Sequence, residues 1–175
     1  MGFSGGAEVV QVDFDKKTVS FDELLNLFWA SHDPTSSNNS RLYQKAVFYH
    51  NESQRLTAKR SLQEQAEKLG RPITSTIEPV QFSIARESEQ KYYLRHDAVL
   101  WKEFKQHYPK TTGVTDSAAA AKVNGYLGGF SNRELFQRYA PSLGLSDSAL
   151  KRLGKKVPEK AGHYLPKCSL PRVEP

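Results

Sequence analysis

The fold is decided around the stretch Phe28-Trp29-Ala30-Ser31-His32-Asp33-Pro34-Thr35. It closes a segment whose apolar residues recur three and four positions apart, as on one face of an α-helix: Phe21, Leu24, Leu25, Phe28 and Trp29. Pro34 disfavours the helical conformation in the residue before it, so the helix is predicted to end at or before His32. Ser20 and Glu23 have the spacing of a capping box and predict where the same helix begins.

The first half of the chain alternates between strand-like and helical segments. Asn51 is a favourable helix cap and Gly70 a favourable helix stop, so they bound a long helix. β-branched and aromatic residues favour strands in the segments on either side. The predicted elements are a strand over residues 7–14, a strand over 45–50, a helix over 52–69 and a strand over 73–77.

The second half is predicted to be helical. Helices are expected over residues 87–96, 97–108, 116–124, from the capping pattern of Ser131 and Glu134 to Pro141, and from Ser146 to Gly154. This order predicts an α+β fold, a two-layer core with a mixed sheet followed by a helical extension. The expected domains are residues 1–108 and 114–154, with a linker over 109–113. Residues 155–175 hold four prolines and are expected to be disordered.

Composition narrows the classes of protein. No apolar run approaches the length of a membrane span, and the N-terminus lacks a secretory pattern. The chain has one cysteine, Cys168, which excludes an internal disulfide and favours a reducing compartment such as the cytoplasm.

The net positive charge of the protein comes from the second half of the chain. Residues 1–94 hold 11 Lys and Arg against 12 Asp and Glu, whereas residues 95–175 hold 14 against 7. This excess either attracts an acidic partner or forms a solvated face. No zinc pattern, RNA-recognition motif or groove-reading helix accompanies it, which argues against a nucleic acid partner.

Three blocks, read in order, resemble the core of the peptide methionine sulfoxide reductase A family. They are Glu8-Val9-Val10-Gln11-Val12-Asp13-Phe14-Asp15, then Val19-Ser20-Phe21-Asp22-Glu23-Leu24-Leu25, then the Phe28–Pro34 stretch. The family carries a glutamate-headed strand, a Ser-Tyr/Phe-Asp/Glu-Glu-Leu-Leu helix and a Phe-Trp-x-x-His-Asp-Pro segment. The resemblance covers residues 2–95, and residues from about 114 resemble the extension of a longer branch of the family.

The resemblance implies an enzyme that reduces methionine S-sulfoxide, free or in proteins, as a monomer with thioredoxin or another thiol as reductant. It implies no metal and no organic cofactor. The family nucleophile is the cysteine of a Gly-Cys-Phe-Trp motif, which this sequence lacks. The chain is therefore expected to be a truncated member with little or no activity. A fragment, a splice form and a retained binding domain all remain open. The alternative is a non-catalytic interaction module whose basic C-terminal tail binds an acidic partner.

Four candidate site residues follow from the resemblance. Glu8 matches the acid that donates a proton to the sulfoxide oxygen, and Tyr43 matches a tyrosine whose hydroxyl holds that oxygen. We expect their side chains to share one cavity. Asn38 and Asn39 fall near the family aspartate and are expected to contact substrate. From the residues alone, an ordinary strand glutamate is the favoured interpretation of Glu8, and the alternative for Tyr43 is a strand-edge aromatic residue that fills the core.

Two further features admit two interpretations each. His32 and Asp33 could form a catalytic or metal-binding pair, but adjacent residues rarely converge on one metal, so a capping role is favoured. Cys168 could be a resolving or even nucleophilic thiol, with Lys167 beside it to lower its pKa, or an inert exposed thiol.

Overall fold

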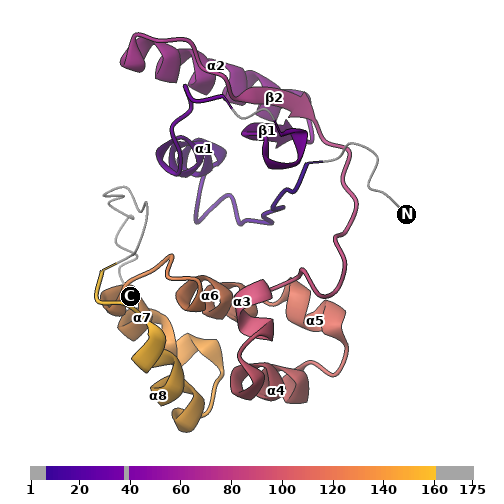
Figure 1. The fold of residues 1–175 in the computed structure, drawn as a ribbon, viewed down its shortest axis with the longest axis vertical. Helices are drawn as coiled ribbons and strands as arrows, with labels where there is room; N and C mark the ends of the chain where they lie inside the picture. The colour runs from indigo at the N-terminus through magenta and orange to yellow at the C-terminus, as the bar shows by residue number, and fades with distance from the viewer. Residues whose placement is uncertain (1–6, 38–39, 161–175) are drawn as a thin grey trace. The chain divides into compact units, whose positions relative to one another are not determined.

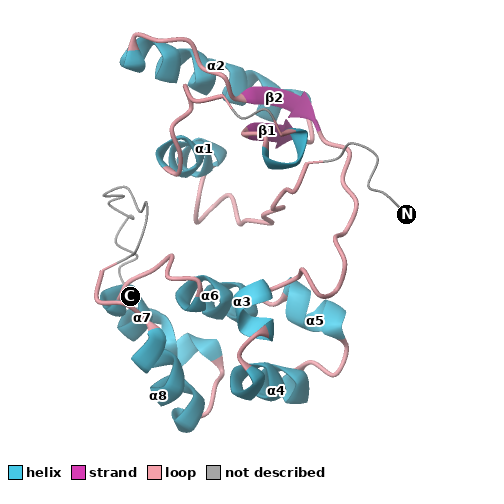
Figure 2. Ribbon diagram, viewed as in Figure 1, coloured by secondary structure: helices cyan, strands magenta, loops and turns pink. Residues whose placement is uncertain are grey.

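The α+β class is confirmed by the computed structural model, which describes residues 7–37 and 40–160 (Figures 1 and 2). The described residues divide after Phe82 into two compact units, here called unit 1 (7–82) and unit 2 (83–160). This division comes earlier than the linker expected over residues 109–113. The reason is that Leu94, Leu100 and Phe104 are buried in one core with the later helices.

Unit 1 consists of two helices and a small sheet. Its elements are α1 (Phe21–Ala30), the 3₁₀ turn η1 (Arg41–Tyr43), β1 (Ala46–Tyr49), α2 (Glu52–Leu69) and β2 (Thr76–Pro79). The predicted helix boundaries are confirmed. Ser20 accepts from the Glu23 backbone N–H in a capping box, Asn51 caps α2, and Gly70 ends α2 in the left-handed conformation at φ 61°. Helix α2 packs against α1 and both strands.

The sheet of unit 1 has two parallel strands within the described residues, so the mixed sheet that the sequence predicted is not formed there. Ala46 pairs with Thr76 and Tyr49 with Pro79. Strand β2 begins at Thr76 instead of at residue 73, because the Thr74 backbone N–H donates to the Pro34 carbonyl at 2.9 Å and leaves the ladder.

The strand predicted over residues 7–14 is absent from the structure. The segment is outside helices and strands, with Val10 89% exposed and Val12 55% exposed. One backbone hydrogen bond ties it to the rest of unit 1, from the Glu8 N–H to the Leu42 carbonyl at 2.9 Å. The valines favour the extended conformation of a strand. A β-ladder also needs a neighbouring strand to pair with, and strand propensity alone does not provide one.

The core of unit 1 is built around Trp29. Its side chain is 4% exposed and lies in one cluster with Leu25, Val47 and Ala58, which joins α1 to β1 and α2. The indole N–H donates to the Ser61 hydroxyl on α2 at 2.7 Å. Because a buried N–H without an acceptor is costly, this hydrogen bond fixes the position of α1 against α2.

Ser61→Ala is expected to lower the free energy of unfolding of unit 1 by about 1–3 kcal/mol, because it leaves the buried Trp29 N–H unsatisfied. The measurement is urea unfolding followed by ¹⁹F NMR of 5-fluorotryptophan, in which Trp29 reports unit 1 and Trp101 reports unit 2. Ser53→Ala, at an exposed position of the same helix, is the control and should leave the Trp29 transition unchanged. Equal effects of the two substitutions would contradict the assignment.

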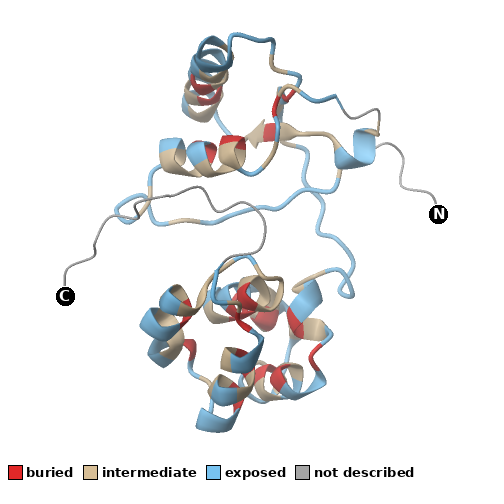
Figure 3. Cartoon of the chain, turned by 60° about the vertical axis from the view of Figure 1, so that its left-hand side comes forward, coloured by how far each residue is buried: buried red, intermediate tan, exposed pale blue. Residues whose placement is uncertain are grey.

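Unit 2 is entirely helical. Its elements are α3 (Tyr92–Arg95), α4 (Ala98–His107), α5 (Thr111–Asp116), α6 (Ala118–Leu127), α7 (Arg133–Tyr139), the 3₁₀ turn η2 (Ala140–Leu143) and α8 (Asp147–Lys156). Helix α6 is central, since it packs against α3, α5, η2 and α8. Figure 3 shows the buried residues of these helices gathered on their inward faces.

Helix boundaries in unit 2 differ from the predicted ones where a side chain contributes to the core. Residues 87–91 are not helical, and Lys91 has φ 50° just before α3. Helix α6 continues through Gly125 because Tyr126 is 4% exposed in the core. Asn132, not Ser131, caps α7. Helix α8 runs to Lys156, past the glycine at which it was predicted to stop.

The segment 109–113, predicted as a linker, contains the start of α5. The Lys105 ammonium donates to the Pro109 carbonyl at 2.6 Å and to the Thr111 hydroxyl at 3.2 Å. Val114 is 1% exposed and anchors α5 in the core. The segment is therefore a packed connection inside unit 2.

A buried carboxylate joins α4 to α8. The Asp97 side chain is 2% exposed and accepts from Arg152 Nε at 3.0 Å and from Lys156 Nζ at 2.7 Å. It also caps α4 by accepting from the Leu100 backbone N–H at 3.2 Å. Burial alone would raise the pKa of this carboxyl, but the hydrogen bonds from Lys156, Arg152 and Leu100 outweigh burial and lower the pKa to about 2.

None of the described helices combines the length and the apolar composition that crossing a membrane requires.

Candidate functional site

The structure brings the segments of Glu8 and Tyr43 together. The Glu8 backbone N–H donates to the carbonyl of Leu42, the residue before Tyr43, at 2.9 Å. Tyr43 is the last residue of η1, three positions before β1. The two candidate residues therefore lie on adjacent backbone segments of unit 1.

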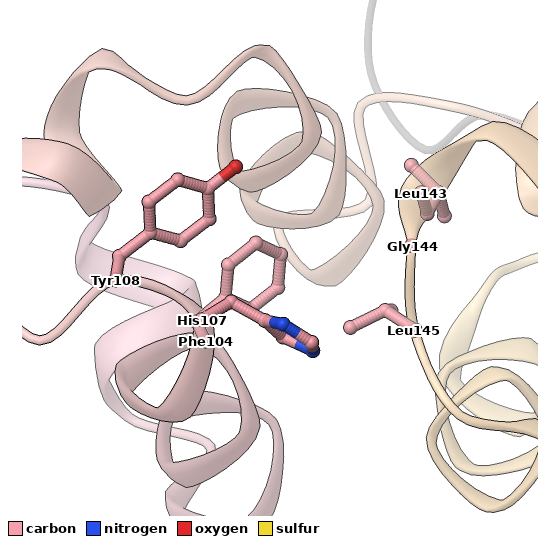
Figure 4. A pocket seen from close by; sticks show the side chains of 6 residues that line it. All are labelled: Phe104, His107, Tyr108, Leu143, Gly144 and Leu145. Carbon is pink, nitrogen blue, oxygen red and sulfur yellow. The ribbon is translucent and has the colours of Figure 1, made fainter.

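The side chains of these two residues lie at the surface. Glu8 is exposed and Tyr43 is 60% exposed. Two hollows in the described residues are lined by other residues. One, of about 270 Å³, lies between residues 14–22 and the start of α2. The other, of about 240 Å³, lies in unit 2 between the end of α4 and the loop after η2 (Figure 4). The expectation that Glu8 and Tyr43 share an enclosed cavity is therefore not met by the described residues.

The turn that follows α1 is ordered by its own side chains. The Asp33 carboxylate accepts from the Thr35 hydroxyl at 2.7 Å and from the Thr35 backbone N–H at 2.9 Å. These two hydrogen bonds, the hydroxyl first, hold the pKa of Asp33 below its ordinary value. Asp33 thus caps the turn, as one of the two interpretations of the His32–Asp33 pair predicted.

His32 lies between Ser31 and Ser75, the residue before β2. Its Nε2 lies 3.3 Å from the Ser75 hydroxyl, and its Nδ1 lies 3.3 Å from the Ser31 hydroxyl. The ring packs edge-on against Phe28 with centroids 4.6 Å apart. Burial, and then the positive charge of Lys45, lower the pKa of His32, so the imidazole is neutral near pH 7.

Lys45 and Thr74 both hydrogen-bond to the same turn. The Lys45 ammonium donates to the Asp33 carbonyl at 2.9 Å, to the Ser36 carbonyl at 3.2 Å and to the Ser36 hydroxyl. The Thr74 hydroxyl lies 3.0 Å from the Pro34 carbonyl and 2.9 Å from the Ser36 carbonyl. Neither residue could be predicted from the sequence, because a lysine and a threonine just before strands carry no motif.

Three of the sequence-based candidates lie outside the described residues: Asn38, Asn39 and Cys168. Among residues 7–37 and 40–160, no group of three or more His, Cys, Asp or Glu side chains could hold a metal ion. What unit 1 offers chemically is a carboxylate and a phenol on neighbouring backbone segments, next to a turn fixed by a lysine.

Comparison with known proteins extends the similarity beyond these residues. The family model described as peptide methionine sulfoxide reductase matches residues 1–130. A peptide methionine sulfoxide reductase MsrA 1 of Rhodopirellula baltica is 32% identical over 136 residues, which is 74% of this chain and 64% of the relative. A peptide methionine sulfoxide reductase of Drosophila melanogaster is 34% identical over 142 residues, which is 79% of this chain and 56% of the relative.

A third relative matches over a shorter segment. A peptide methionine sulfoxide reductase MsrA of Methanosarcina acetivorans is 41% identical over 99 residues, 51% of this chain and 52% of the relative. The chain thus spans between 52% and 64% of the length of these three curated relatives.

Proposed function

The chain belongs to the peptide methionine sulfoxide reductase family, and from this premise we propose that its site is of the kind that reduces methionine S-sulfoxide, free or in proteins. Because residues 1–175 lack the Gly-Cys-Phe-Trp cysteine, this chain is expected to bind the sulfoxide without turning it over. The observation that carries the proposal is the family match over residues 1–130, which includes Glu8 and the Phe28–Pro34 stretch. The Glu8–Leu42 hydrogen bond supports it, because it lies beside Tyr43.

The reaction defines what the site must supply. Reduction of a sulfoxide to a thioether removes the oxygen as water and consumes two electrons and two protons, which two thiols provide as they form a disulfide. A thiolate attacks the sulfur while an acid protonates the oxygen, on which negative charge builds up. In this proposal Glu8 donates that proton, and the Tyr43 hydroxyl donates a hydrogen bond to the same oxygen. Asn38 and Asn39 contact the substrate.

The implied partners follow from the same chemistry. Thioredoxin or another dithiol supplies the electrons, and no metal or organic cofactor takes part. A thiol reductant persists only in a reducing compartment, so the proposed location is the cytoplasm. The proposed working unit is a monomer.

Binding of the substrate is the direct test. N-acetyl-methionine S-sulfoxide amide, titrated into ¹⁵N-labelled protein, is expected to shift the amide signals of residues 7–9 and 41–45, whereas the R epimer should bind more weakly. Glu8→Ala and Tyr43→Phe are each expected to weaken binding of the S epimer by about 3- to 10-fold, which corresponds to one hydrogen bond of roughly 1 kcal/mol.

Matched substitutions make this test specific. Asp13→Ala removes an exposed carboxylate from the same N-terminal segment, and Tyr49→Phe removes a hydroxyl from β1. Neither should change the affinity. Equal binding of the two epimers, or signal shifts confined to unit 2, would refute the proposed function.

A further inference from the structure

Lys45, two residues after Tyr43, joins this segment of the chain to the sheet of unit 1. Its carbonyl accepts from the Thr76 N–H at 3.0 Å, next to the first pair of the β1–β2 ladder. On the other side of Tyr43, the Leu42 carbonyl accepts from the Glu8 N–H. Tyr43 therefore lies in the chain between two residues whose backbone carbonyls are hydrogen-bonded, Leu42 and Lys45.

The side chain of Lys45 reaches back to the turn after α1. An ammonium has three hydrogens, and three oxygens receive them: the Asp33 carbonyl, the Ser36 carbonyl and the Ser36 hydroxyl. Two of the three acceptors are backbone carbonyls, so the backbone conformation of the turn positions the oxygens that bind the Lys45 ammonium. Hydrogen bonds from an ionised donor are about twice as strong as neutral ones, which suits a link between segments far apart in the sequence.

We propose that Lys45 is a positioning residue, which acts through Tyr43 by tying the turn Asp33–Ser36 to the start of β1. The proposal rests on the proposed function, in which the Tyr43 hydroxyl holds the sulfoxide oxygen. Thr74 holds the same turn from the β2 side, so the turn is linked to the residues that precede both strands. Glu8 joins the segment of Tyr43 through Leu42, which places the acid and the phenol on a common support.

The geometry requires an ammonium and not merely a positive charge. Three acceptors that converge on one point suit the compact ammonium group, whereas the planar guanidinium of arginine directs its hydrogens outward in a fork. Lys45→Arg is therefore expected to behave like a loss of the residue. The same ammonium contributes to the lowered pKa of His32, alongside burial, while the carboxylate of Asp33 opposes it.

The test combines two structural readouts with binding. In Lys45→Met, amide exchange at Ser36 and Thr74 is expected to accelerate by about tenfold, because local opening of the turn becomes easier. The pKa of His32, followed by NMR, is expected to rise as the nearby positive charge is removed. Lys59→Met, at an exposed position of α2, is the matched control and should change neither readout.

Binding then shows whether Lys45 acts through Tyr43. Lys45→Met is expected to weaken binding of N-acetyl-methionine S-sulfoxide amide by about tenfold in the wild-type background. In the Tyr43→Phe background the same substitution should have no further effect on binding, because the hydroxyl through which Lys45 acts is already absent. Additive effects, or a result equal to that of Lys59→Met, would overturn the proposal.

Restoring the ammonium at position 45 by chemical modification controls for the possibility that a Lys45 variant is simply misfolded. Lys45→Cys in a Cys168→Ser background, alkylated with 2-bromoethylamine, returns an ammonium at the original length and should restore all three readouts. Alkylation of the same thiol with iodoacetamide should not. If the wild type binds no sulfoxide, the proposed function fails. Amide exchange and the pKa of His32 then still decide whether Lys45 holds the turn, and unchanged values would overturn that as well.

Discussion

Incubated with methionine S-sulfoxide and dithiothreitol, the chain of residues 1–175 is expected to form no more methionine than the thiol alone. The family reaction begins with attack by a cysteine thiolate on the sulfoxide sulfur. The only cysteine of the chain is Cys168, beyond the matched residues 1–130. An acid and a phenol can assist that attack but cannot replace the nucleophile. The measurement is the conversion of dabsyl-methionine S-sulfoxide, resolved by chromatography.

Two variants make the outcome informative. Cys168→Ser should leave the background unchanged if this thiol is inert. Turnover that Cys168→Ser abolishes would identify Cys168 as the nucleophile. Turnover that survives Cys168→Ser would refute cysteine chemistry for this chain altogether. The relative from Methanosarcina acetivorans, assayed under the same conditions, serves as the positive control.

Asp97→Asn is expected to destabilise unit 2 by about 2–3 kcal/mol at pH 7, since a shift of the carboxyl pKa from 3.8 to about 2 is worth roughly 1.4 kcal/mol per unit. Asparagine keeps the shape and the capping ability, so the loss reports the charge. Asp97→Ala also removes the cap on Leu100 and should cost about 1 kcal/mol more. The ¹⁹F signal of Trp101 in urea measures both.

The direction of the Asp97 pKa shift determines how its contribution to the free energy of unfolding changes with pH. The pKa of Asp97 is lower in the folded protein than in the unfolded chain, so its contribution is complete above the unfolded pKa. It is lost as the pH falls from about 5 to about 2. The difference in the free energy of unfolding between wild type and Asp97→Asn should become smaller over that pH range. Asp116→Asn, at an exposed position of α5, is the control. A gap that stays constant down to pH 2 would contradict the ionic origin.

Local chemistry was sufficient to predict the two helices of unit 1. Ser20, Glu23, Asn51 and Gly70 act within a few residues of the helix end they define, and the structure confirms each of them. Strands depend on partners elsewhere in the chain. The segment 7–14 has the composition of a strand but no ladder, and β2 is displaced because Thr74 is hydrogen-bonded to the turn after α1.

The candidate site was predicted only as far as family motifs reach. Glu8 and Tyr43 were proposed by matching blocks, and the structure shows a backbone hydrogen bond from Glu8 to Leu42, the residue before Tyr43. Their exposure could not be read from the blocks, because it depends on which segments cover them. Lys45 remained undetected since its role depends on two backbone carbonyls, and backbone positions carry no signature in the amino-acid sequence.

The central place of α6 determines what the residues after 130 contribute to unit 2. The family match ends at residue 130, just after α6, yet the buried face of α6 is completed by later residues. The Tyr126 ring packs edge-on against Phe136 at 5.5 Å, and Ala149 and Leu153 of α8 belong to the same core. Removal of α7 and α8 would expose the middle of this core to water. Residues after 130 therefore complete a buried surface on a helix that the family match includes.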